Sequence, residues 1–148
     1  MERKISYFSK SEIETINFAF SFSKNLKDND ILILEGNLGS GKTIFVKGLA
    51  KGFSIYDDII SPTFLIVNSY YGKNIKLNHF DLYKIEDFDE LYYIGIEEYL
   101  ENKGNINIFE WGMKFIDYFI SYNVPNIFII KIKIVSEDER EIEVEKIK

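Results

Sequence analysis

The chain has 148 residues, of which 46% are hydrophobic and 28% are charged, and its formal net charge is −6 at pH 7. These values are typical of a soluble globular protein, and the length predicts a single domain over residues 1–148. The acidic balance argues against strong direct nucleic-acid binding, which needs a basic footprint, and the absence of Cys excludes disulfides, thiolate catalysis and Cys-based zinc sites.

The chain shows no sign of a membrane or secretory segment. No apolar run approaches the roughly 18 residues of a membrane-spanning helix. The N-terminal stretch MERKISYFSK lacks the apolar core of a signal peptide. We therefore expect a cytoplasmic protein without membrane contact.

The N-terminal segment predicts a strand followed by a helix. Residues 5–8 form the short strand, and the helix covers residues 12–26. Ser9 or Ser11 would cap it, because a serine hydroxyl accepts hydrogen bonds from the free N–H groups of a first turn. The spacing of apolar residues predicts that its inward side chains are Ile13, Ile16, Phe20 and Phe22.

Residues 36–43 read GNLGSGKT, which matches the phosphate-binding P-loop pattern G-x-x-x-x-G-K-[ST]. The apolar run 31–34 precedes the loop, and residues 42–51 follow it as a predicted helix. This is the strand–loop–helix setting that the motif needs. A glycine-rich turn capped by Thr43 is the weaker interpretation.

Each part of the loop has a physical role in binding a nucleotide. Its glycines allow positive φ and a close approach to phosphate oxygens, and successive N–H groups at the helix start form an anion nest. Lys42 supplies a positive charge for the outer phosphates, and Thr43 supplies a hydroxyl for Mg²⁺. The residues predicted to hold the nucleotide are Asn37, Leu38, Gly39, Ser40, Gly41, Lys42 and Thr43.

The middle of the chain predicts a β-hairpin and two short helices. Residues 64–71 and 75–80 flank the turn Gly72-Lys73-Asn74. Residues 87–93 and 96–101 form the helices, with Asp87 and Glu90 in the positions of a capping box.

The C-terminal part predicts a buried strand, a helix and a second hairpin. Residues 106–109 form the strand and residues 111–119 the helix, while residues 127–135 and 141–147 pair across a polar turn. The alternation of elements predicts an α/β fold, a three-layer P-loop NTPase-like domain with a mixed, partly parallel sheet and a C-terminal β-hairpin.

ATP hydrolysis needs a metal-side carboxylate, a group that positions water and a sensor of the γ-phosphate. Glu110 ends the apolar strand 106–109, the usual place for such a carboxylate, and Asp81 ends a hairpin strand and competes for the role. Thr63, in the loop SPTF, offers a hydroxyl to Mg²⁺ or the γ-phosphate. Each segment also has a simpler interpretation when it is taken alone. Glu110 could be a solvated residue at a strand end, His79 a structural histidine, and SPTF an ordinary Ser-Pro turn.

Four motifs in this order and at this spacing, GNLGSGKT, SPTF, HFDLYK and IFEW, resemble those of the TsaE (YjeE) family of small bacterial P-loop ATPases. The resemblance covers about residues 30–111. The family usually has Arg where this chain has Lys84, and Lys lacks the bidentate fork of Arg. It also favours Thr or Ser where this chain has Ile44.

The resemblance implies a Mg-dependent ATPase, slow when alone, that is needed for threonylcarbamoyladenosine modification of tRNAs reading codons that begin with A. It implies action on a TsaB–TsaD heterodimer, with tRNA involved only indirectly. By position, it implies that Lys42 holds phosphates and that Thr43 and Glu110 hold Mg²⁺. It also implies that Asp81 orients water and that Thr63 is a mobile switch residue.

The sequence bears on three alternative functions. A GTPase should carry N-K-x-D, but residues 102–105 read NKGN. A small-molecule kinase would place several Arg on a lid, and the only Arg residues here are Arg3 and Arg140. A nucleotide-dependent assembly module with incidental hydrolysis stays open.

The remaining expectations concern the rim of the site. We expect adenine near residues 8–11, including Ser11, and near the turn 137–140. There Arg140 would stack on the ring or meet a phosphate, unless it belongs to a solvated turn. Trp111 is expected close to the site, as packing or as a partner surface. Residues 61–64 are predicted to form a nucleotide-sensing switch coupled to partner binding.

Overall fold

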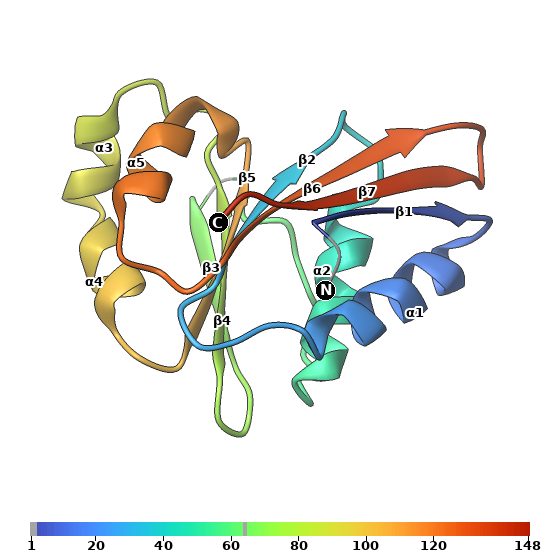
Figure 1. Cartoon of the computed structure of the whole chain (residues 1–148), viewed down its shortest axis with the longest axis horizontal. Coiled ribbons are helices and arrows are strands. Elements are labelled where there is room, and N and C mark those ends of the chain that lie inside the picture. The colour runs from blue at the N-terminus through green and yellow to red at the C-terminus, as the bar shows by residue number, and fades with distance from the viewer. Residues whose placement is uncertain (1–2, 64) are drawn as a thin grey trace.

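A computed structural model describes residues 3–63 and 65–148 as helices packed around one seven-stranded sheet (Figure 1). The sheet order is β1-β7-β6-β2-β5-β4-β3. The strands are β1 Lys4–Ser9, β2 Ile31–Glu35, β3 Val67–Tyr71, β4 Lys76–Asp81, β5 Asn105–Glu110, β6 Ile127–Ile134 and β7 Arg140–Lys146. The helices are α1 Glu12–Ser23, α2 Lys42–Gly52, α3 Phe88–Tyr93, α4 Ile96–Glu101, the 3₁₀ turn Met113–Phe115 and α5 Ile116–Ser121.

The sheet is mixed, as predicted. Strands β4, β5, β2 and β6 run parallel to one another, and the C-terminal hairpin β6–β7 extends the sheet to β1 by antiparallel pairing. The predicted middle hairpin is β3–β4. Strand β5 lies directly beside β2, so the strand that ends in Glu110 is central and next to the P-loop strand, as expected from its apolar sequence.

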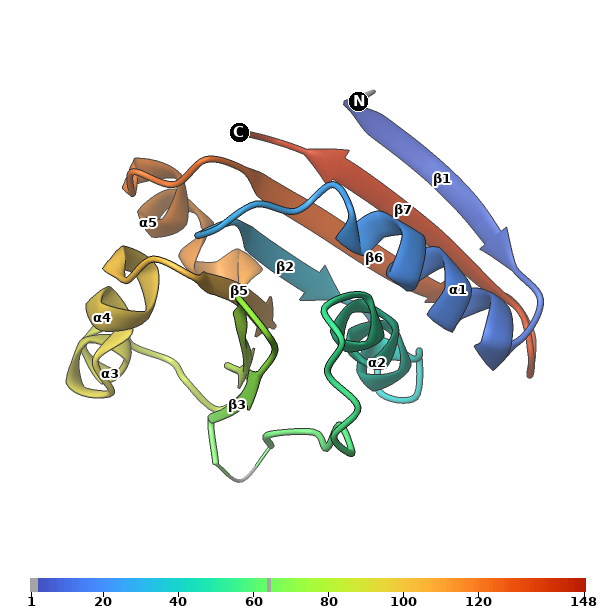
Figure 2. The same cartoon turned by 90° about the horizontal axis from the view of Figure 1, so that it is seen from below.

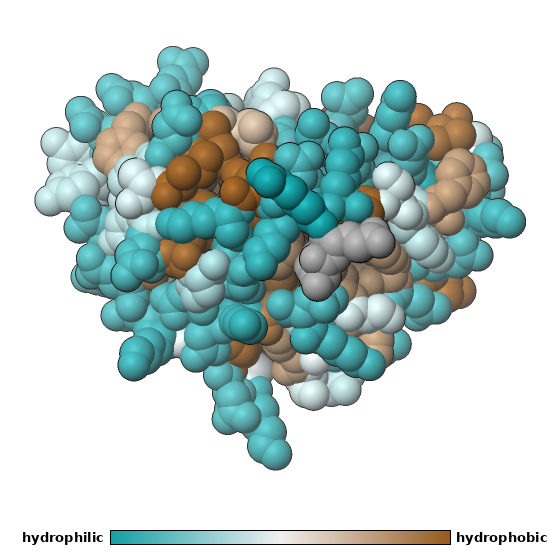
Figure 3. All heavy atoms as spheres, in the orientation of Figure 1, coloured by the Kyte–Doolittle hydropathy of each residue, from teal (hydrophilic) through white to brown (hydrophobic). Residues whose placement is uncertain are grey.

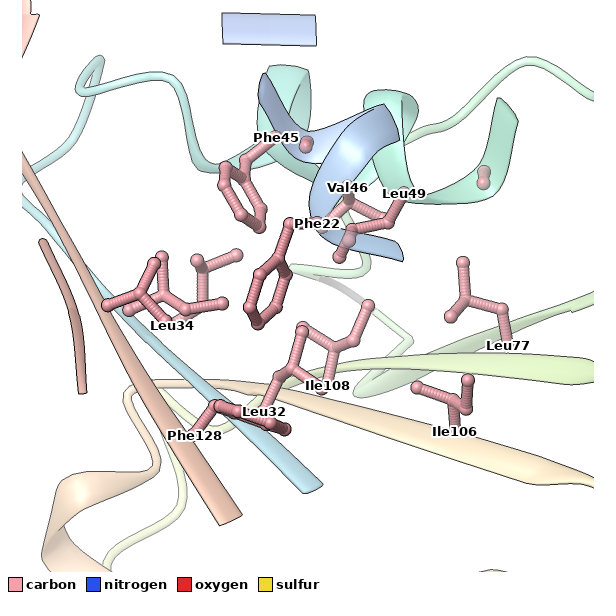
Figure 4. Close-up of a cluster of buried hydrophobic side chains, with 14 of the residues drawn as sticks. Phe22, Leu32, Leu34, Phe45, Val46, Leu49, Leu77, Ile106, Ile108 and Phe128 are labelled. Atoms are coloured by element: carbon pink, nitrogen blue, oxygen red, sulfur yellow. The ribbon is translucent and has the colours of Figure 1, made fainter. Parts of the chain in front are cut away.

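The two faces of the sheet bury separate hydrophobic clusters, which makes three layers (Figure 2). Alternate residues of one strand point to opposite faces. Leu32 and Leu34 therefore pack under α1 and α2, while Ile31 and Ile33 pack under α3, α4 and α5. Figure 4 shows Phe22 of α1 and Phe45 of α2 above the first of these faces.

Helices α1 and α2 pack closely because small residues lie between them. A Cβ atom added to Gly48 would lie 2.5 Å from the carbonyl oxygen of Ile16 and 2.7 Å from the Cβ of Ala19. The prediction that Ile13 faces inward is wrong, because this side chain is 69% exposed and Thr15 is buried instead. Residues two apart lie about 200° apart around a helix, so the two cannot share a face.

Of the two serines predicted to cap α1, Ser11 is the cap, whereas the predicted end of the helix was wrong. The Ser11 hydroxyl accepts a hydrogen bond from Glu14 N at 3.1 Å. The helix ends at Ser23 rather than at residue 26. Asp87 caps α3 by accepting a hydrogen bond from Asp89 N at 3.2 Å, rather than from Glu90 N as the predicted capping box requires.

Two other predicted boundaries differ. Strand β3 begins at Val67 rather than at residue 64, because Ile66 has a positive φ of 68°, which breaks the extended backbone; Phe64 lies outside the described residues. The helix predicted over residues 111–119 is instead a 3₁₀ turn followed by α5. It cannot begin at Trp111, whose φ of 60° is left-handed.

The surface seen in Figure 3 is mostly hydrophilic, with hydrophobic side chains gathered mainly beside α5. Within the part of the chain that the structure describes, no helix combines the length and the apolar character needed to cross a membrane.

Candidate nucleotide-binding site

A cavity of about 700 Å³ opens at the carboxyl ends of the parallel strands β2, β5 and β4. Ligands of parallel α/β sheets bind at this edge. Of the predicted site residues, Asn37 alone does not line the cavity, although its carbonyl accepts a hydrogen bond from Ser40 N at 3.0 Å. The predicted residues that line it are Ser11, Leu38, Gly39, Ser40, Gly41, Lys42, Thr43, Thr63, Asp81, Glu110 and Arg140.

The P-loop joins β2 to α2, and its glycines serve two different purposes. Gly39 and Gly41 have φ values of 80° and 103°, the left-handed region in which residues with a Cβ are strained. Gly36 is not in that region, so our expectation of positive φ was wrong for it. There a Cβ would lie 2.8 Å from the backbone carbonyl oxygen of Ile132, so close packing requires glycine.

Lys42 begins α2, and its ammonium group lies inside the site rather than in solvent. The side chain is 9% exposed. Its Nζ donates a hydrogen bond to the carbonyl of Gly36 at 2.7 Å and lies 3.4 Å from Glu110 Oε1. The same atom lies 4.5 Å from the centre of the Trp111 ring. The structure thus brings the loop lysine together with the carboxylate that ends β5.

Glu110 is buried between two basic groups. His79 of β4 is fully buried, and its Nε2 lies 2.5 Å from Glu110 Oε2. Burial by itself raises the pKa of Glu110, but the hydrogen bond and charge of His79, together with the charge of Lys42, outweigh burial and leave that pKa below its usual value. Glu110 is therefore an ionised carboxylate that His79 holds from behind the cavity.

Asp81 and Thr63 form a second polar group at the same edge. Asp81 ends β4 in register with Glu110 of β5. The Thr63 hydroxyl donates a hydrogen bond to Asp81 Oδ2 at 3.1 Å, and Asp81 Oδ1 accepts one from Tyr83 N at 3.0 Å. The loop before β3 is thus tied to a carboxylate that lies beside the P-loop.

Trp111 forms one wall of the cavity, next to Tyr83. Their ring centres are 5.2 Å apart. Left-handed backbone is strained for a residue with a large side chain, and such strain gathers at functional sites. Trp111 takes this conformation, and its ring lies over the Lys42 ammonium. The expectation of Trp111 near the predicted site agrees with this position.

Arg140, at the start of β7, is half-buried and contacts the P-loop. Its guanidinium donates hydrogen bonds to the carbonyls of Gly39 and Ser40 in the P-loop. It also donates to three carbonyls of the β6–β7 turn, those of Ser136, Glu137 and Glu139.

Sequence reasoning missed several residues of the site. Glu12, Thr15 and Tyr83 line the cavity, whereas His79, which the sequence analysis named as a structural residue, supports it from behind. Thr15 could have been found from Ser11, because residues three or four apart share a helix face. The motif HFDLYK also contains His79 and Tyr83, at alternate positions around Asp81.

The oxygen donors that meet here suit Mg²⁺, which binds one or two protein groups, keeps several waters and takes substrate phosphates. Among residues 3–63 and 65–148, no group of three or more His, Asp or Glu side chains forms a metal cage. A P-loop between β2 and α2, with two carboxylates at the ends of adjacent parallel strands, defines a P-loop-type protein, a class that binds nucleotides.

Comparisons with known proteins agree with this class. The family model described as "Threonylcarbamoyl adenosine biosynthesis protein TsaE" matches residues 9–142. A tRNA threonylcarbamoyladenosine biosynthesis protein TsaE from Rickettsia typhi is 39% identical over 88% of this chain and 87% of its own. One from Treponema pallidum is 32% identical over 92% of this chain and 96% of its own. The crystal structure of Bacillus subtilis YdiB matches with a TM-score of 0.75 and 30% identity, over 100% of this chain and 88% of that chain.

The chain belongs to the TsaE family, whose role is in tRNA threonylcarbamoyladenosine biosynthesis. The resemblance inferred from the four motifs and the predicted P-loop fold are both confirmed.

Proposed function

We propose that the protein is a Mg-dependent ATPase of tRNA threonylcarbamoyladenosine biosynthesis. The observation that supports this most strongly is the contact of Lys42 with Glu110 at the mouth of a P-loop. The P-loop lysine of such proteins reaches the outer phosphates, and a strand-end carboxylate lies on the metal side. Membership of the TsaE family supports the pathway.

In this proposal the loop backbone and Lys42 hold the phosphates of ATP. Thr43 and Glu110 hold Mg²⁺, which would neutralise negative charge on the phosphates. Asp81 orients the attacking water, and Thr63 senses the γ-phosphate. Adenine lies between the start of α1, at Ser11, and the β6–β7 turn. These assignments rest on the chemistry of the residues that line one cavity.

We propose that hydrolysis is slow when the protein is alone. An arginine that reaches the transferred phosphoryl group accelerates P-loop enzymes by about 10³–10⁵-fold. The chain has two Arg residues. Arg140 is engaged with backbone carbonyls, and Arg3 precedes β1 at the end opposite the Ser9–Arg140 pair.

The proposed partner is a TsaB–TsaD heterodimer that modifies tRNAs reading codons that begin with A. We propose that the protein contacts tRNA only indirectly, because its net charge of −6 repels phosphate backbones. It would work in the cytoplasm as a single domain over residues 1–148, whose two cores share one sheet.

The test combines turnover with partner binding. Wild-type protein and the variant Glu110→Gln are mixed with TsaB–TsaD, with and without Mg·ATP, and ATP hydrolysis, co-purification and tRNA modification are measured. We expect ATP-dependent co-purification for both proteins and turnover for the wild type only. If neither protein co-purifies under any nucleotide condition, the proposed partner is wrong. If modification proceeds equally with Glu110→Gln, hydrolysis is incidental and the protein is an assembly module.

A further inference from the structure

Arg140 connects two segments that are a hundred residues apart. Its Nε donates to the Ser40 carbonyl at 2.9 Å and its NH2 to the Gly39 carbonyl at 3.3 Å. Its NH1 donates to the carbonyls of Ser136, Glu137 and Glu139 at 2.8, 3.1 and 2.9 Å. Strand pairing with Ser9 of β1 and Ile134 of β6 fixes the backbone from which this side chain extends.

These hydrogen bonds determine how the P-loop peptides are turned. In a trans peptide the C=O and the following N–H point in opposite directions. A guanidinium that holds the Ser40 carbonyl therefore directs the N–H of Gly41 away from Arg140. An anion nest needs successive N–H groups on one side of the loop. Gly39 and Gly41 cannot impose that orientation themselves, because glycine is conformationally permissive.

We propose that Arg140 is a positioning residue that holds the P-loop in its phosphate-binding conformation. It acts through the carbonyls of Gly39 and Ser40 and contacts neither the base nor a phosphate. The turn carbonyls anchor the other side of the guanidinium, so the β6–β7 hairpin supports the loop. Lysine cannot replace it, because an ammonium lacks the planar fork that reaches both segments. The inference rests on the proposed nucleotide site.

The first experiment measures dissociation constants of Mg²⁺-pyrophosphate, ADP and ATP by calorimetry. The proteins are wild type, Arg140→Ala, Arg140→Lys and Arg3→Ala, the last as a control that removes the same charge from the far end of the β1–β7 pair. We expect both Arg140 variants to weaken all three ligands by the same factor, about tenfold or more. Arg3→Ala should match the wild type.

Other patterns would overturn the inference. If the Arg140 variants bind ADP and ATP more weakly but bind pyrophosphate as tightly as the wild type, Arg140 contacts the base. If the variants lose more affinity for ATP than for ADP, Arg140 contacts the γ-phosphate. If Arg140→Lys binds all three ligands as tightly as the wild type, the positive charge at this position is sufficient and the planar fork is not needed. If wild-type protein binds none of the three ligands, the proposed nucleotide site fails. If it binds them and Arg140→Ala binds equally well, only the positioning role fails.

The second experiment examines the loop without nucleotide. Hydrogen exchange of a peptide covering residues 36–45 is compared in wild type, Arg140→Ala and Arg3→Ala, each checked for folding by circular dichroism. We expect faster exchange in Arg140→Ala only, because the loop has lost its support. Unchanged exchange would contradict the positioning role. If Arg140→Ala does not fold, the same comparison with Arg140→Lys decides.

Discussion

At the scale of single residues, the site is organised around the Glu110 carboxylate. Lys42 approaches one oxygen from the P-loop, and His79 approaches the other from β4. The side chain of Glu110 is 6% exposed, so a lost partner leaves a carboxylate oxygen with little access to water. A buried acceptor without a partner costs roughly 1–3 kcal/mol.

This arrangement predicts that His79→Ala lowers the free energy of unfolding by about 1–3 kcal/mol, because Glu110 loses a buried hydrogen-bond partner. The variant His79→Gln, whose side-chain amide is also a donor, should recover part of the loss. Denaturant unfolding at pH 7 measures both. Equal stability of His79→Ala and wild type would show that the contact contributes nothing.

Thr63 is predicted to matter for hydrolysis more than for binding of the product. Its hydroxyl contacts Asp81, the residue that we propose orients water. In Thr63→Ala we expect turnover to fall about tenfold, equivalent to roughly 1.4 kcal/mol, with ADP affinity nearly unchanged.

Steady-state hydrolysis and ADP titration measure these two effects. Ser61→Ala is the matched control, because the Ser61 hydroxyl shares a hydrogen bond with Thr63, whereas the Asp81 carboxylate accepts from Thr63 and Tyr83. Normal turnover in Thr63→Ala, together with identical hydrogen exchange of the switch segment in ADP and in a non-hydrolysable ATP analogue, would exclude the switch role.

At the scale of elements, α1 and α2 depend on a close approach at Gly48. An added methyl group there would meet the backbone of Ile16 and the side chain of Ala19. Gly48→Ala should therefore lower stability by about 1–3 kcal/mol, although alanine favours helix. Thermal unfolding measures the change, with Lys47→Ala, an exposed position on the same helix, as the control. A stabilised Gly48→Ala would mean that the helices can separate at low cost.

The elements with strong local signals were predictable from the sequence. Residues 31–35 form β2 as expected, because a fixed motif marks where that strand ends. The inward face of α1 was predictable at Phe22, which is buried as expected, but not at Ala19, because a small residue carries little apolar signal. The left-handed backbone conformation of Trp111 was also not predictable from the sequence. The Trp111 ring contacts the Lys42 ammonium and the Tyr83 ring, and these residues are distant from Trp111 in the sequence.

The site itself was predictable as a set of residues, but not as a set of contacts. Parallel strands bring their carboxyl ends to one edge, so Asp81 and Glu110 were expected near the P-loop. The engagement of Arg140 with the loop carbonyls had no sequence signal, because backbone acceptors are present at every residue.

At the scale of the whole molecule, residues at the ends of four strands of the sheet line the cavity. The P-loop follows β2, the carboxylates end β4 and β5, and Arg140 begins β7. The N-terminal helix closes the side at Ser11. A nucleotide bound there would therefore contact segments from both ends of the chain, which predicts that it stabilises the whole fold rather than one loop.

ATP binding at the P-loop is tested most directly by calorimetric titration of Mg·ATP into wild-type protein and Lys42→Ala. Lys42→Met, which keeps most of the side-chain volume, is the second variant, and circular dichroism confirms that each protein is folded. We expect saturable binding by the wild type and none by either variant, because the phosphates lose their positive charge. A folded Lys42→Ala protein that binds Mg·ATP as tightly as the wild type would contradict the proposed site.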